Sequence, residues 1–74
     1  IDIMPNPASN YFNIEGENII KIEIYNAVGQ VVDIINVNGN NAQINTENYN
    51  NGIYFVRVLT SDANVTVKKV VVSK

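Results

Sequence analysis

The sequence predicts an all-β fold, an immunoglobulin-like β-sandwich of about seven strands, built as a single domain. Ile, Val and Thr supply 25 of the 74 residues, and these β-branched side chains favour strands over helices. Asn supplies another 14 residues, mostly in clusters between apolar runs, where turns are needed. Short alternating runs recur along the chain and no stretch has a helical period, which is typical of a sandwich or barrel.

The strands are expected at seven places, separated by turn-forming residues. They span residues 1–4, 11–14, 20–25, 30–37, 42–45, 52–59 and 65–74. The first strand must end at Pro5-Asn6-Pro7, because proline has no N–H to donate to a sheet ladder. Gly29 closes the turn after the third strand, where a positive φ is favoured. The segments interpreted as turns or loops are residues 15–18, 38–41, 46–51 and 61–64.

Alternation along the strands predicts which side chains enter the core. In residues 20–25 the three isoleucines share one face, and the residues between them face water. In residues 52–59, Tyr54, Val56 and Val58 share a face. Because the opposite face of that run is also largely apolar, we expect this strand to be central and partly covered on both faces.

The fourth expected strand has an ambiguous pattern. If Asp33 faces water, Val32 and Ile34 lie inside. Ile35 and Val37 would then face out, although they are equally apolar. A bulge, or burial of both faces, would reconcile the two halves of this strand.

Composition excludes most familiar chemistry. There is no Cys and no His, so disulfides, thiolate nucleophiles, zinc–thiolate sites and the commonest general base are absent. The net charge is −2 with five basic residues, which gives no footprint for nucleic acid or for an anionic membrane. No apolar run approaches the roughly 20 residues that a transmembrane helix needs.

The remaining polar clusters are weak candidates for a site. Glu15 and Glu17 are close in sequence, but no apolar residue flanks them closely enough to raise a carboxyl pKa for acid–base work. The Asn cluster at residues 36–40 contains no acid, and Asp62 stands alone, so a calcium loop is disfavoured against simple turn chemistry. We therefore predict no catalytic residue, no metal and no cofactor.

Lys68 and Lys69 are adjacent in the last expected strand. Neighbouring residues of a strand point to opposite faces, so one lysine should point toward the apolar side. Either this strand lies at a sheet edge, where a lysine blocks unwanted pairing, or the pair is exposed for a partner. The residues alone do not decide between these interpretations.

Four motifs occur in a fixed order along the chain. They are Pro5-Asn6-Pro7-Ala8, the run 22–26 continuing into 28–32, the run 51–58, and the closing run 67–72. Together they resemble the type A C-terminal sorting domain of the type IX secretion system of Bacteroidetes, over essentially all 74 residues. Met4 stands where the family often has an aromatic residue, and Arg57 replaces a common Lys with the same charge.

This resemblance implies a fold and a function. Such domains are small immunoglobulin-like β-sandwiches at the C-terminus of exported proteins, and they are secretion signals, not enzymes. The parent enters the periplasm, the translocon recognises the domain, and the cargo reaches the cell surface or the medium. A sortase-like peptidase commonly removes the domain, with the cut expected upstream of Ile1. Residues 1–74 are thus expected to be a single sorting domain cut from a larger exported protein.

The family motifs assign candidate residues. Pro5, Asn6 and Pro7 match the opening motif, Gly29 and Gly52 match turns, and Tyr54 matches the long strand. The closing motif is matched by Lys68, Lys69, Val70, Val71 and Val72. The two glycines and the tyrosine have sufficient structural reasons of their own, whereas the lysines and the end of the last strand are expected to serve recognition.

Two other classes of protein compete with this interpretation. One is a non-catalytic carbohydrate-binding or adhesion module, for which Tyr25 is the best exposed aromatic residue, but no planar row of Trp is present. The other is a spacer module of the fibronectin type III kind. In isolation, thinly charged strand edges also predict a strand-exchanged homodimer.

Overall fold

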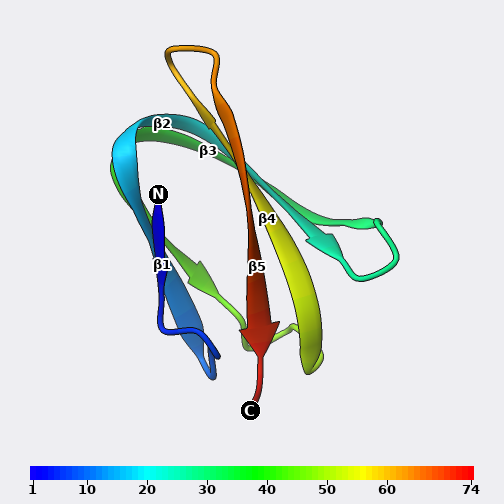
Figure 1. The fold of residues 1–74 in the computed structure, drawn as a ribbon. Coiled ribbons are helices and arrows are strands. Elements are labelled where there is room, and N and C mark those ends of the chain that lie inside the picture. Colours follow the sequence, from blue (N-terminus) through cyan, green and yellow to red (C-terminus); the bar gives the residue numbers. More distant parts are fainter.

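The computed structural model describes all 74 residues and consists of five strands with no helix (Figure 1). The strands are β1 (Asp2–Met4), β2 (Tyr11–Asn26), β3 (Val31–Asn45), β4 (Gly52–Thr60) and β5 (Val65–Val72). The all-β prediction is confirmed. Five strands replace the seven expected, because residues 11–14 and 20–25 belong to one long strand, β2, and residues 30–37 and 42–45 fall almost entirely within another, β3.

The strands form one curled sheet in which all strand pairs are antiparallel. The order is β1-β2-β4-β5, and β3 pairs with the other edge of β2. The first half of β2 pairs with β1 on one edge and with the last residues of β3 on the other. The second half of β2 pairs with β4 and with the first residues of β3. Figure 1 shows β2 and β3 curving together, which is compatible with a sandwich of shorter segments.

The bend in this hairpin comes from irregular pairing. Glu15 pairs with Asn41 and Ile19 pairs with Gly39, so three residues of β2 lie opposite one residue of β3. Asn18 has a φ of 54° in this bend, and its N–H donates to Oδ1 of Asn40 at 3.1 Å. The segments 15–18 and 38–41, which were expected to be turns, therefore stay within their strands and bend them.

A second irregularity decides which isoleucines enter the core. Ile19 pairs with Thr60 and Lys21 with Leu59 on β4, so Ile20 is an extra residue on β2. A bulged residue leaves the normal alternation. Ile19 is fully buried and Ile20 is 40% exposed. The prediction that Ile20 faces the core is therefore wrong, while Ile22 and Ile24 are buried as predicted.

A bulge also resolves the ambiguous pattern of β3. Ile24 pairs with Asp33 and Tyr25 with Val31, so Val32 is unpaired between them. Ile35, opposite the buried Ile22, is half-buried against the core together with Val37. Ile34 is 48% exposed. Of the two alternatives left open, the structure has the bulge and not burial of both faces, and Val32 and Ile34 do not lie inside.

The core lies between the two halves of the curled sheet. Its buried members are Ala8, Phe12, Ile14, Ile19, Ile22, Ile24, Ile44, Tyr54, Val56, Val58, Val70 and Val72. The prediction for Tyr54, Val56 and Val58 is confirmed. β4 is central, between β2 and β5, but no other layer covers its second face. The structure contains no helix that could span a membrane.

Candidate recognition surface

The opening and closing motifs, at opposite ends of the sequence, lie against each other. The Nδ2 of Asn6 donates to the carbonyl oxygen of Lys69 at 3.1 Å, and the N–H of Val71 donates to Oδ1 of Asn6 at 3.1 Å. The N–H of Ala8 donates to the Val71 carbonyl at 2.7 Å, and the N–H of Ser73 donates to the Ala8 carbonyl at 2.8 Å. The segment at Pro5-Asn6-Pro7 therefore caps the otherwise free edge of β5 near its end.

The end of β5 is part of the core. Val70 is fully buried and Val72 is 1% exposed, so the expectation that the end of the last strand is exposed is wrong for these two residues. Val71, which points to the opposite face, is half-buried. Beyond the strand, the Lys74 N–H donates to Oδ1 of Asn51 at 3.0 Å, so Lys74 is bonded to the segment that directly precedes β4.

Lys68 and Lys69 lie just before this buried end. Lys68 is opposite Val56 and Lys69 is opposite Phe55 on β4, and both lysines are exposed. Neither ammonium group makes a hydrogen bond or an ion pair, since the one salt bridge in the structure joins Arg57 to Glu23. β5 is a sheet edge, as the edge-protection interpretation requires, and both cations are accessible, as the recognition interpretation requires.

The matched glycines and tyrosine each have a structural reason. Gly29 has a φ of 86° in a turn where its N–H donates to the Asn26 carbonyl at 3.0 Å. Gly52 begins β4 with a φ of 152°. The Tyr54 hydroxyl donates to the Asn50 carbonyl at 2.7 Å, and its ring is 5.2 Å from that of Tyr49. These contacts fix two turns and the start of β4.

One surface was not anticipated from the sequence. The face of β3, β2, β4 and β5 that points away from the core, here named the outer face, carries many apolar side chains. Its apolar members are Tyr25, Val31, Ile34, Ile53, Phe55, Leu59, Val65, Val67 and Val71. The signal was present, because residues at both alternate positions of β4 and β5 are apolar. Alternation alone does not tell which of two apolar faces is covered.

The centre of the outer face holds an ion pair. Arg57 Nη1 donates to Oε1 of Glu23 at 2.7 Å, and the Tyr25 hydroxyl donates to Oε2 of Glu23 at 3.2 Å. Partial desolvation of the Glu23 carboxyl acts to raise its pKa, but these hydrogen bonds and the charges of Lys21 and Arg57 outweigh it, so the pKa is lowered. Glu23 is therefore ionised at neutral pH. The hydroxyl of Tyr25 is engaged by this carboxylate.

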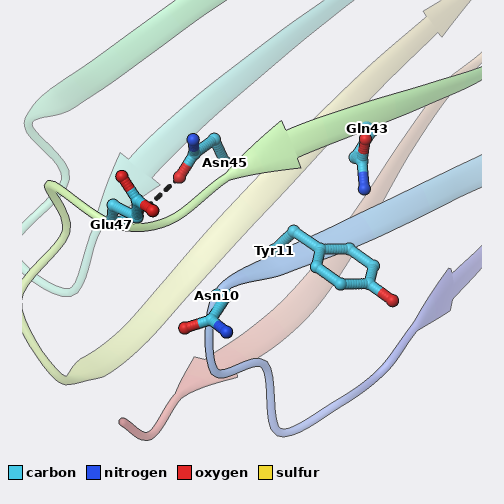
Figure 2. A pocket seen from close by; sticks show the side chains of 5 residues that line it. All are labelled: Asn10, Tyr11, Gln43, Asn45 and Glu47. Carbon is cyan, nitrogen blue, oxygen red and sulfur yellow. Dashed lines mark hydrogen bonds between the residues drawn. The ribbon is translucent and has the colours of Figure 1, made fainter.

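The hollows on the surface are shallow and do not collect catalytic groups. One of about 270 Å³ is lined by Asn10, Tyr11, Gln43, Asn45 and Glu47 (Figure 2). In it the Glu47 N–H donates to Oδ1 of Asn45 at 2.8 Å, and Glu47 is the single carboxylate. Another, of about 280 Å³, lies between residues 26–28 and 50–54 and has no ionisable side chain except that of Tyr54.

The carboxylates considered for chemistry lie apart from both hollows. Glu15 and Glu17 are exposed at the bend of β2. Asp62 lies in its own hairpin turn, where donation from the Thr60 hydroxyl and then from the Asn64 N–H lowers its pKa. No group of three acidic residues lies together in a way that could hold a metal ion.

Fold and surface together define a small all-β module with an exposed edge strand and an open, largely apolar sheet face. The chain belongs to the family of secretion system C-terminal sorting domains, because the model of that family matches residues 2–73. Comparison of this chain with the curated proteins and with the solved structures found no match. The domain is a signal for type IX secretion: it interacts with that machinery and directs export across the outer membrane, to the cell surface or the medium.

Proposed function

We propose that this domain is a non-catalytic secretion signal, which the type IX translocon recognises in the periplasm at the surface around Lys68 and Lys69. The observation that carries this proposal is the joining of the two end motifs: Asn6 binds the main chain of β5 at Lys69 and Val71, next to two unpaired ammonium groups. Unpaired and accessible charges can steer a partner of opposite charge to this surface, and no existing ion pair has to be broken for them to bind it.

The same proposal covers the fate of the domain. A sortase-like peptidase removes it by a cut upstream of Ile1, and the cargo is anchored to the surface or released. Residues 1–74 then form a single sorting domain of a larger exported protein. The absence of an enzymatic role is supported by the scattered carboxylates, none of which shares a hollow with a second acid or with a lysine.

The test is a transplant of the complete 74-residue chain. The chain is fused behind a periplasmic fluorescent reporter in a Bacteroidetes host with a working type IX system, and the reporter is measured in periplasm, surface and medium. We expect delivery to the surface or medium that disappears in a translocon-deficient strain. Retention of a folded, intact fusion in the periplasm contradicts the proposal and favours a binding or spacer module.

Substitution of the lysines tests the recognition site within the same assay. A Lys68→Ala, Lys69→Ala variant should lower delivery, because it removes both accessible charges without touching the core. The matched control is Lys68→Arg, Lys69→Arg, which keeps both charges and should be delivered like the unaltered chain. Equal delivery by the alanine and arginine variants contradicts a role for these charges. The strand-exchanged homodimer of the isolated domain stays a prediction, which sedimentation of the purified chain checks.

A further inference from the structure

The outer face departs from what an uncovered sheet face normally looks like. A face open to water usually alternates to polar residues, with the apolar ones kept inside. Here Val67 is 58% exposed, Val31 is 53% exposed and Ile34 is 48% exposed. Strand pairing places the apolar side chains of this face next to one another in successive rows. These rows are Asn36–Lys21–Leu59–Val65, Ile34–Glu23–Arg57–Val67, Val31–Tyr25–Phe55–Lys69 and Ile53–Val71.

The size of this face suits a docking surface. Four strands about 4.8 Å apart and a length of about 20 Å from Ile53 to Leu59 give the whole face, charged side chains included, a flat footprint of roughly 400 Å². The largest apolar patch on a typical single domain covers about 300–600 Å² and is often functional. A standard interface covers about 800 Å² per partner, so this face would supply the centre of an interface whose rim is polar.

The charges on the face indicate the chemistry of the partner. Lys21, Arg57 and Lys69 point to this side, whereas Glu23 is its single carboxylate and is already bonded to Arg57. The face therefore carries a net charge of +2, although the whole chain carries −2. A second copy of the domain would bring like charges together, which disfavours self-association through this face. A partner surface that places apolar side chains on the apolar residues of this face and acidic side chains beside Lys21 and Lys69, on either side of the satisfied Arg57–Glu23 pair, is complementary to it.

We propose that a protein component of the type IX machinery docks on the outer face through an apolar patch edged by acidic side chains. This inference rests on the proposed function and extends it from the two lysines to a whole sheet face, of which Lys69 is one corner. Phe55 and Val67 lie in adjacent rows of the face, and neither contributes to the core.

The delivery assay separates this docking face from a general effect of surface composition. A Phe55→Ser, Val67→Ser variant should lower delivery about tenfold, the effect of losing one strong set of contacts. The matched control is Tyr11→Ser, Val28→Ser, which removes two exposed apolar side chains elsewhere and should stay within about twofold of the unaltered chain. Thermal unfolding of both purified variants shows whether either has lost its fold. If the face variant melts appreciably below the control, the single change Val67→Ser replaces it.

Crosslinking identifies the occupant. A photo-reactive residue is placed at Val67, or at Val28 as control, in the reporter fusion in secreting cells. A product with a type IX protein from Val67 but not from Val28 supports the proposal. A product with a second copy of the fusion, with the reporter or with lipid overturns it. Equal delivery by the face variant and the unaltered chain overturns this inference alone, whereas periplasmic retention of the unaltered chain overturns the proposed function as well.

Discussion

Replacing Val70 by Ala tests the conclusion that the last strand completes the core. Val70 is fully buried and lies opposite Tyr54 on β4. The change removes two methyl-sized groups, which costs about 1.6 kcal/mol at about 0.8 kcal/mol each, and a residual cavity brings the loss to about 2 kcal/mol. A domain of this length has a total stability of about 4–11 kcal/mol, so the loss is a large share of it.

Urea and thermal unfolding measure this loss. Far-ultraviolet circular dichroism and tyrosine fluorescence are suitable signals, since the chain has four Tyr and no Trp. A domain of this size shifts its Tm by about 4–8 °C per kcal/mol, so Val70→Ala should lower Tm by about 8–16 °C. The control is Val67→Ala on the same strand, which is 58% exposed and should change stability by at most about 0.5 kcal/mol. Equal effects of the two substitutions would refute the placement of Val70 in the core.

Three other predictions concern the edge cap, a turn and a buried hydroxyl. Asn6→Ala loses two hydrogen bonds to β5 and should cost about 1–2 kcal/mol in urea unfolding, whereas Asn10→Ala, which loses no side-chain hydrogen bond, should not. Gly29→Ala forces a side chain into a φ of 86° and should cost about 1–2 kcal/mol, whereas Gly39→Ala, with a normal φ and nothing within 4 Å, should be tolerated. Burial raises the pKa of Tyr49 to about 12, so the folded state holds this proton more tightly than the unfolded state. The contribution of this protonated hydroxyl to stability should therefore be fully present below pH 10.0 and should fall as the pH rises from there toward 12. Tyr49→Phe should remove that part of the fall, which an ultraviolet titration of the tyrosines and unfolding measurements at the same pH values check.

Those parts of the fold that depend on local pattern were predictable from the sequence. Alternation in β4 predicted that Tyr54, Val56 and Val58 share one face, because the strand is regular, and the structure shows that this face is the buried one. The two bends were not predictable, because residues 15–18 and 38–41 have the composition of turns. They lie opposite each other across the β2–β3 hairpin, so strand pairing continues past them. The composition of a segment does not indicate which distant segment pairs with that segment.

The candidate surface was predictable only in part. The exposure of Lys68 and Lys69 follows from their position on an edge strand. Nothing in the sequence indicated that the Asn6 side chain would bond to the main chain of that edge, because this contact joins residues 63 and 65 positions apart. The outer face was missed for another reason. Residues 52–59, which form β4, were interpreted as partly covered on both faces, whereas the strands form one curled sheet with no further layer over this face.

The last strand links the core to both proposed recognition features. Val70 points into the core, Val67 and Lys69 point to the outer face, and the edge main chain of the strand binds Asn6. Removal of the residues from Val70 onward would therefore unfold the domain and would not by itself identify a recognition segment. The substitutions of Lys68, Lys69, Phe55 and Val67 avoid this problem, because they leave the core intact. Since Val70 and Val72 of this strand are buried in the core, the surface proposed for recognition forms only when β5 is folded.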